Sequence, residues 1–152
     1  MAREPIPTWF FVHTIVRKDD KFLLIHERKH GQTWYLPAGR VNPSERLDKA
    51  AIRETLEESG VPVVLDGILR IEHQARRDYT RVNTIFVAHP AADVAPISEP
   101  NEDALEARYF TLAEMLQLPL REYSVLQLLN LVEKGAPIFP LSVLSTEAFS
   151  SF

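Results

Sequence analysis

The sequence of 152 residues contains no cysteine, which excludes a disulfide framework, a cysteine-based zinc site and a thiol nucleophile. Only five residues are glycine, and no glycine-rich phosphate loop follows a predicted strand, so the Rossmann and P-loop classes are excluded. No apolar run approaches the length of about 18 residues that a membrane-spanning helix needs. The first residues also lack the pattern of a secretory signal. We therefore expect a cytoplasmic protein that does not cross a membrane.

An excess of positive charge is also absent. The sequence has 17 Lys and Arg residues and 21 Asp and Glu residues, which gives a formal net charge of −4. This balance excludes a protein that binds nucleic acid through bulk positive charge. The hydrophobic fraction of 45% and the charged fraction of 25% are close to the averages of globular proteins. The length matches about one domain. We predict a single domain over residues 1–152.

Mixed secondary structure is predicted along the chain. Strands are expected at residues 8–17, 21–26, 34–37, 61–76, 81–89 and 106–110, and helices at residues 44–59, 111–117 and 122–134. Asn42 or Ser44 is expected to cap the first helix, and Gly60 to end it. Residues 90–103, rich in proline and acids, are predicted to form an exposed loop, and the tail from residue 136 to pack onto the domain or a partner. The mixture predicts an α/β or α+β fold in which helices cover a mixed sheet.

Three carboxylates, Glu54, Glu57 and Glu58, lie close together near the end of the first predicted helix. Spacings of three and four residues put them on one face. Like charges one turn apart repel, and the helix dipole disfavours anions at this end, so local physics opposes the arrangement. A divalent cation that prefers carboxylate oxygen, Mg²⁺ or Mn²⁺, would compensate. The alternative is an ordinary acidic face in contact with solvent.

Residues 39–61, GRVNPSERLDKAAIRETLEESGV, resemble the signature of the Nudix (MutT-type) hydrolase family. The seven fixed positions are occupied by Gly39, Glu45, Arg53, Glu54, Glu57, Glu58 and Gly60. Val61 fits one apolar position, whereas Thr55 departs from the other. The resemblance implies the Nudix α/β/α sandwich, with a mixed β-sheet between the helix of this box and a C-terminal helix.

The resemblance also implies a role for each residue of the box. Glu54, Glu57 and Glu58 would bind the metal ions together with the backbone carbonyl of Gly39, and Glu54 could alternatively deprotonate the attacking water. Arg53 would orient the carboxylates and pair with Glu45. Glu45 and Gly60 would then be structural. Cleavage of a diphosphate requires neutralised phosphate oxygens and an activated water, and carboxylate-bound Mg²⁺ supplies both.

A further acid is expected in the loop before the last short strand, because many members of the family recruit one there. The loop offers Glu99, Glu102 and Asp103. Asp103 lies six residues before Tyr109, a spacing similar to that of the extra metal ligand or base in the family. We predict that Asp103, rather than Glu102, has this role. The alternative is a solvated acidic loop.

Five further side chains are candidates for substrate binding: Arg28, Trp34, Arg40, Arg81 and Asn83. Arg28 follows a predicted strand, where a guanidinium could reach a phosphate. Arg81 and Asn83 share one strand face by the period of two. Trp34 could stack on a base. For the arginines the alternative is a solvated surface, and for Trp34 it is a place in the core.

The function that follows from the resemblance is Mg²⁺-dependent hydrolysis of a small nucleotide or another diphosphate-linked compound. Residues 36–41, 119–121 and 140–141 are similar to the small nucleoside di- and triphosphate phosphatases, which include enzymes acting on oxidised guanine nucleotides. ADP-ribose, dinucleoside polyphosphates and capped RNA are other substrates of the family. A homodimer is left open. The alternatives are a non-catalytic Nudix domain that senses a nucleotide and, from the H-E-x-x-H pattern at residues 26–30, a zinc metalloprotease.

Overall fold

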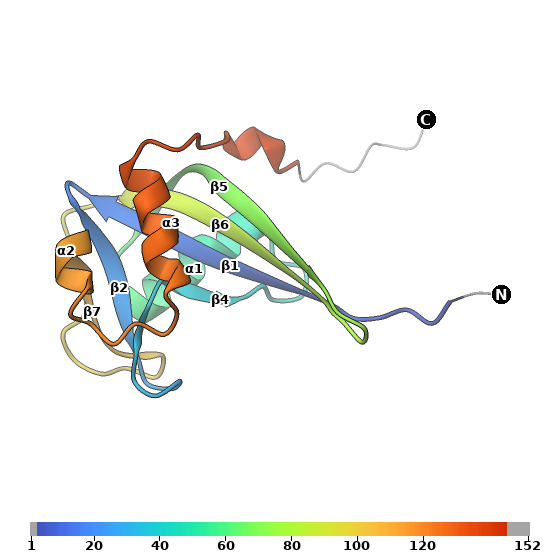
Figure 1. Cartoon of the computed structure of the whole chain (residues 1–152), viewed down its shortest axis with the longest axis horizontal. Coiled ribbons are helices and arrows are strands. Elements are labelled where there is room, and N and C mark those ends of the chain that lie inside the picture. The colour runs from blue at the N-terminus through green and yellow to red at the C-terminus, as the bar shows by residue number, and fades with distance from the viewer. Residues whose placement is uncertain (1–2, 146–152) are drawn as a thin grey trace.

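The computed structural model describes residues 3–145 and shows a mixed β-sheet with helices on both faces (Figure 1). The strands are β1 (Thr8–Lys18), β2 (Lys21–Glu27), β3 (Trp34–Tyr35), β4 (Ala38–Arg40), β5 (Val63–Ala75), β6 (Thr80–Pro90) and β7 (Ala104–Phe110). The helices are α1 (Leu47–Ser59), α2 (Leu112–Met115) and α3 (Ser124–Glu133), followed by a 3-10 turn, η1 (Leu141–Val143). None of the helices within residues 3–145 is long and apolar enough to cross a bilayer.

Strand β1 lies in the middle of the sheet, whose order is β3-β2-β1-β6-β5. It pairs in parallel with β6 over most of its length and antiparallel with β2 and β4. Strand β7 adds to β2 in antiparallel orientation, and β5 forms a long hairpin with β6. One parallel pair among antiparallel pairs makes the sheet mixed, so the predicted α/β class is confirmed.

The two faces of the sheet bury separate cores, because successive side chains of a strand point to opposite sides. On β2, Leu23 and Ile25 belong to the core under α1, which contributes Ala50 and Ala51. Leu24 of the same strand belongs to the other core, to which α3 contributes its buried leucines and valines. The mixed sheet therefore lies between the box helix and the C-terminal helix, as the resemblance implied (Figure 1).

Helix α1 begins three residues later than the sequence predicts. Ser44 adopts a left-handed backbone conformation with φ of 63°, and neither Asn42 nor Ser44 caps the helix. The N-cap is Arg46, without a side-chain cap hydrogen bond. The physical reason is Glu45, whose carboxylate accepts hydrogen bonds from the Asn42 amide and from Arg53, so residues 42–46 form a turn. The predicted end is confirmed, since Gly60 has φ of 72° and its N–H donates to the Leu56 carbonyl.

The chain after α3 returns to the sheet beside β5, which is the last strand in the order. Phe139 forms an antiparallel bridge with Ile68, exchanging backbone hydrogen bonds of 2.8 and 2.9 Å. A Cβ atom at Gly67 would lie 2.4 Å from the Phe139 carbonyl oxygen, so glycine allows this close approach. Leu141 and Leu144 pack against the core under α1. The described part of the apolar tail thus packs onto the domain, and residues 146–152 lie outside the described residues.

Candidate active site

Arg53 is the centre of an ion-pair network on α1. Its Nε and Nη2 donate to Glu45 Oε1 and Oε2 at 2.7 and 2.9 Å. Its Nη1 donates to Glu54 Oε1 at 2.7 Å and to Glu57 Oε2 at 3.0 Å. The hydrogen bonds from Arg53 lower the pKa of Glu45. The pairing of Arg53 with Glu45 is therefore present, and the same guanidinium orients two of the three clustered carboxylates.

The other carboxylate of the cluster, Glu58, is partly buried. Its Oε2 accepts a hydrogen bond of 3.0 Å from the Ala38 amide. Burial nevertheless raises the pKa of Glu58 well above its usual range, and the negative charges of Glu54, Glu27 and Asp103 raise it further. Burial also raises the pKa of Glu54, although Arg53 opposes the shift. The cluster of three carboxylates thus contains two, Glu54 and Glu58, whose anionic forms are destabilised. A bound cation would relieve this destabilisation.

Gly39 of β4 packs directly against this cluster. A Cβ atom built on Gly39 would lie 2.0 Å from Glu54 Cδ, so a side chain at this position would displace the carboxylate. The donor set formed by the carboxylates of Glu54, Glu57 and Glu58 and a backbone carbonyl is one that Mg²⁺ and Mn²⁺ prefer. Among residues 3–145, no three His, Cys, Asp or Glu side chains are arranged to hold a metal ion as they stand. Glu54 and Glu57 accept hydrogen bonds from Arg53, and Glu58 accepts one from the Ala38 amide.

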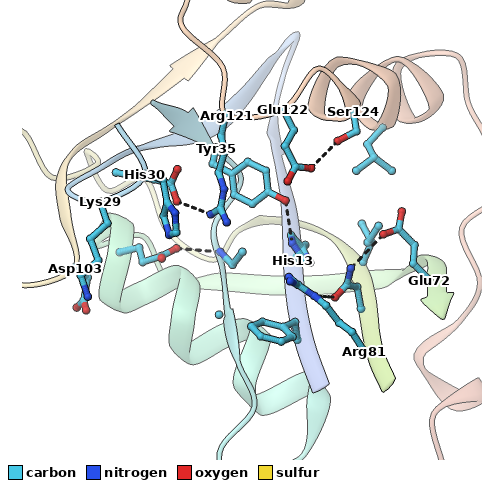
Figure 2. A pocket seen from close by; sticks show the side chains of 18 of the residues that line it. His13, Lys29, His30, Tyr35, Glu72, Arg81, Asp103, Arg121, Glu122 and Ser124 are labelled. Atoms are coloured by element: carbon cyan, nitrogen blue, oxygen red, sulfur yellow. Dashed lines mark hydrogen bonds and ion pairs between the residues drawn. The ribbon is translucent and has the colours of Figure 1, made fainter. Parts of the chain in front are cut away.

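A cavity of about 690 Å³ opens beside the cluster. Gly39, Glu58 and the loop acids line one part of it. Strands β1 and β6 line another part, with His13 and Arg81 (Figure 2). The cavity therefore connects Glu58 of the box to a polar wall on the α3 side of the sheet.

Of the three candidate acids in the loop, Glu102 and Asp103 line this cavity and Glu99 does not. Glu102 and Asp103 are exposed, and they directly precede β7. The charge of Asp103 raises the pKa of both Glu54 and Glu58, whereas Glu102 is not among the causes of either shift. The charge of Asp103 is therefore coupled to both of these box carboxylates.

The loop before these acids is exposed but fixed to the domain. The Ile97 amide donates to the Ser59 carbonyl at the end of α1, and the Ile97 carbonyl accepts from the Ala107 amide, both at 2.9 Å. Ile97 itself packs against the core under α1. The prediction of an exposed loop over residues 90–103 holds for most of it, although Pro90 belongs to β6.

Three of the five predicted substrate-binding side chains line the cavity, namely Arg28, Arg81 and Asn83. Arg28 Nη1 donates to the Asn101 carbonyl at 2.5 Å. Arg81 Nε donates to Asn83 Oδ1 at 2.9 Å, and Asn83 Nδ2 donates to Glu72 Oε2 at 3.3 Å. Arg81 and Asn83 thus share a face of β6, as the period of two predicts, and form one polar network.

Two candidates lie elsewhere. Trp34 is 6% exposed, stacks on His26 with ring centroids 4.6 Å apart and meets Phe110 edge-on, so it belongs to the core and is not free to stack on a base. Arg40 does not line the cavity, and its guanidinium lies 3.7 Å from the centre of the Trp9 ring. Because successive residues of a strand face opposite sides of the sheet, Arg40 and its neighbour Gly39 in β4 face opposite sides. The structure therefore does not bring Trp34 or Arg40 to the cavity.

A protein-family model, the NUDIX domain, matches residues 10–129, a stretch that includes most of β1, strands β2 to β7 and the box helix. The chain belongs to the Nudix family. Solved structures with the Nudix fold agree with this assignment. A Nudix hydrolase from Nitrosomonas europaea superposes with a TM-score of 0.78 at 24% identity, over 94% of this chain and 99% of that one. The MutT protein from Methanosarcina mazei Go1 gives 0.65 at 22% identity, over 89% and 100% of the two chains.

Two relatives carry names that describe an activity. The human 8-oxo-dGDP phosphatase NUDT18 is 33% identical over 117 residues, which are 75% of this chain and 35% of that relative. Phosphatase NudJ from Escherichia coli is 28% identical over 107 residues, 70% of each chain. The chain spans about a third of the length of the NUDT18 relatives.

The zinc metalloprotease alternative is wrong. In this Nudix fold, residues 26–30 are the end of β2 and the turn that follows, so no helix carries His26 and His30 on one face. His30 has a left-handed backbone with φ of 56°. The His26 ring stacks on Trp34, and its Nε2 lies 3.0 Å from the Gln32 carbonyl oxygen.

The polar wall of the cavity contains functional candidates that sequence reasoning missed. His13 Nε2 lies 3.2 Å from the Tyr35 hydroxyl, and Arg121 Nη1 donates to Glu27 Oε1 at 2.9 Å (Figure 2). The Arg121 guanidinium also lies 4.8 Å from the centre of the Tyr35 ring. His13 alternates with Phe11 and Ile15 on one strand face, which is a signal in the sequence. The partner strand is not signalled, because the parallel pairing of β1 with β6 is nonlocal.

His13 is 5% exposed, and its Nδ1 has no hydrogen-bond partner among the described residues. Burial, with the nearby positive charge of Arg81, lowers the pKa of His13 to about 4. Burial also raises the pKa of Tyr35 to about 12, so both members of the pair are neutral near pH 7.

The lowered pKa of His13 predicts acid-sensitive stability. The unfolded chain binds this proton near pH 6.5 and the folded chain only near pH 4, so the stability is complete above pH 6.5 and is lost as the pH falls towards 4. Between pH 7 and 5, His13 should account for about 2 kcal/mol of lost unfolding free energy.

Denaturant unfolding of wild type and His13→Asn at both pH values measures this contribution, and the variant should lose less stability on acidification. The exposed His73 supplies the control, since His73→Asn should keep the wild-type pH dependence. Equal pH dependence in wild type and His13→Asn would show that the buried imidazole does not govern acid stability.

Proposed function

We propose that the protein is a metal-dependent hydrolase that cleaves a phosphoanhydride bond of a nucleoside di- or triphosphate. The observation that carries the proposal is that Gly39, Glu58 and Asp103 line one cavity, which extends to a polar wall. A site for a diphosphate needs acidic metal ligands at one end and hydrogen-bonding groups for the organic part of the substrate at the other. This cavity offers both.

The residues that would hold the metal are Glu54, Glu57 and Glu58, with the carbonyl of Gly39. Mg²⁺, or Mn²⁺ in its place, supplies charge neutralisation on phosphate oxygens and an activated water when bound. The Glu54 carboxylate occupies the space that a side chain at position 39 would need, and this close approach to the Gly39 backbone supports the assignment.

The remaining residues of the box and the loop would act on the substrate and its water. Arg53, already bonded to Glu54 and Glu57, would keep these carboxylates oriented. Asp103 would accept a proton from the attacking water, with Glu54 the alternative base. Arg28 at the cavity would bind a phosphate oxygen through its free guanidinium N–H groups.

The substrate that we propose is a guanine nucleotide with an oxidised base. The names of the NUDT18 relatives support this choice. The wall supplies both donors and acceptors, because Asn83 has one of each and Glu72 is a carboxylate. Burial opposes ionisation of Glu72, but its hydrogen bonds with Arg70 and Asn83 lower its pKa overall. A carboxylate can accept hydrogen bonds from the N1–H and amino groups of guanine. The homodimer and the cytoplasmic location remain predictions from the sequence.

The test is a panel of substrates assayed for product release with Mg²⁺, with Mn²⁺ and with excess chelator. The panel contains dGDP, dGTP, their 8-oxo forms, ADP-ribose and diadenosine polyphosphates. We expect metal-dependent release of phosphate or pyrophosphate, fastest from an 8-oxo nucleotide, and no release with chelator. Binding of a nucleotide without any turnover would instead identify a nucleotide sensor. Turnover that persists with chelator would overturn the metal assignment.

A further inference from the structure

Asn101 connects the loop of the two acids to three separate parts of the candidate site. Its side-chain Oδ1 accepts hydrogen bonds of 2.8 Å from the amides of both Asp103 and Ala104. Its Nδ2 donates to the Glu57 carbonyl of α1 at 3.0 Å. Its own carbonyl accepts from Arg28 Nη1 at 2.5 Å. One residue therefore contacts the backbone of Asp103, the box helix and a cavity-lining arginine.

The bond to Glu57 satisfies a group that the helix leaves unpaired. The last four carbonyls of a helix have no partner within it. At the end of α1, the Leu56 carbonyl accepts from Gly60 and the Ser59 carbonyl from Ile97, and the Glu57 carbonyl accepts from Asn101. The loop is thus fixed to the same helix end at Ile97 and again at Asn101.

These contacts fix the backbone at Asp103 and Ala104, which determines how the Asp103 side chain is oriented. The side chains of residues 98–100 and of Glu102 and Asp103 are exposed, whereas Asn101 is half-buried. Packing against the core therefore does little to hold this stretch. Two amides at adjacent positions share Asn101 Oδ1, which sets the direction of the chain as it enters β7.

We propose that Asn101 is a positioning residue, which places the Asp103 carboxylate over the cavity by joining the loop to α1 and to Arg28. The inference rests on the proposed function in one respect, the use of Asp103 in hydrolysis. The side-chain amide suits this role because it carries an acceptor and a donor together. Aspartate keeps the acceptor and loses the donor, and serine offers a shorter acceptor.

The first experiment compares Asn101→Ala in two backgrounds, the wild type and Asp103→Asn, with the kcat and KM of each protein measured at saturating Mg²⁺. Removal of the side chain should lower kcat by up to about 100-fold, the scale on which small misplacement of a reacting group acts. KM should change little. In the Asp103→Asn background the same removal should have almost no further effect, because the group that Asn101 positions is already lost.

Two conservative variants separate the bonds of Asn101. Asn101→Asp retains acceptors for the amides of Asp103 and Ala104 and loses the donor to the Glu57 carbonyl. Asn101→Ser retains only a short acceptor. We expect kcat to follow the order wild type, Asn101→Asp, Asn101→Ala, and Asn101→Ser to lie above Asn101→Ala. Failure of the conservative variants to recover any kcat would overturn the proposal.

Asn130 provides a matched control, since its Nδ2 also donates to a helix carbonyl, that of Leu126 at 2.8 Å, and it does not line the cavity. Asn130→Ala should lower the melting temperature slightly and leave kcat unchanged. If Asn101→Ala lowered kcat by the same factor in both backgrounds, or lost activity only in proportion to its melting temperature, a general structural role would replace positioning.

Amide hydrogen exchange tests the positioning without any activity. Exchange at Asp103 and Ala104 should accelerate in Asn101→Ala, and exchange at Ile97 should not. Unchanged exchange at these two amides would overturn the proposal even in an active enzyme. If the wild type hydrolyses no substrate, the proposed function fails, and exchange still decides whether Asn101 fixes the loop. If hydrolysis is normal in both Asn101→Ala and Asp103→Asn, the positioning role fails and the hydrolase function stands.

Discussion

Glu58→Gln should remove most metal-dependent hydrolysis and leave the metal-free protein at least as stable as the wild type. The change deletes a charge that would hold the metal, and we expect kcat/KM to fall by at least about 100-fold, since loss of even an outer-shell partner of a metal ligand costs 10–100-fold. A Gln carbonyl can still accept the hydrogen bond that the Ala38 amide donates to Glu58. The fold should therefore persist.

The expected gain in stability follows from the sign of the Glu58 shift. Its pKa is raised in the folded protein, so the stability associated with this group is complete at low pH and is lost as the pH rises through the folded value. At pH 7 without metal, the wild type carries this cost and Glu58→Gln does not. Calorimetric melting with chelator and product assays with Mg²⁺ measure the two effects.

Glu133→Gln is the matched control, because Glu133 pairs with Arg17 on the surface and does not line the cavity. It should keep full activity. Near-complete turnover of Glu58→Gln at saturating Mg²⁺ would contradict the metal assignment. A marked fall in its melting temperature would contradict the stated cost of the buried charge.

Asp103→Asn should lower kcat by about 100-fold or more, the usual scale for loss of a general base, with little change in KM. The carboxylate lies at the cavity edge, and its charge reaches Glu54 and Glu58. A base acts in the transition state more than in the binding of substrate, so the effect belongs to kcat. Steady-state kinetics on the best substrate of the panel measures both constants.

Glu102→Gln should be the milder change, measured beside Asp103→Asn as its neighbouring control. Both side chains line the cavity, so burial and composition do not separate them. If Glu102→Gln is the crippling variant, the assignment is off by one residue. If neither variant loses activity, the loop is an acidic surface, and Glu54 becomes the first candidate for the base.

The box was predictable because its geometry is local. Spacings of three and four residues within one helix put Glu54, Glu57 and Glu58 together, and Arg53 reaches Glu45 across the turn that precedes the helix. The end of α1 at Gly60 follows from the left-handed conformation that glycine adopts readily. The start of α1 was predicted three residues too early. Glu45 is hydrogen-bonded to Arg53, and Ser44 does not cap the helix.

The wall of the cavity could not be predicted from local patterns. His13 and Asn83 line the same cavity because β1 pairs in parallel with β6, with Phe11 opposite Asn83. The sequence carries no direct signal for that register. The position of Trp34 could not be predicted either, since an aromatic side chain can stack on a nucleotide base or pack in the core. The role of Asn101 has no local signal in the sequence, because its side chain bonds to a residue that is distant along the chain. Its partner Glu57 lies 44 positions away.

The return of the chain beside β5 has a consequence for how copies of the protein meet. The outer strand of a sheet presents unpaired N–H and C=O groups, which can recruit a strand from another molecule. Here Phe139 occupies those groups of Ile68, and Gly67 admits the passing backbone without a side chain in between. This part of the edge is closed to strand exchange, so sheet-to-sheet fusion at residues 67–68 is blocked by the protein's own C-terminal segment.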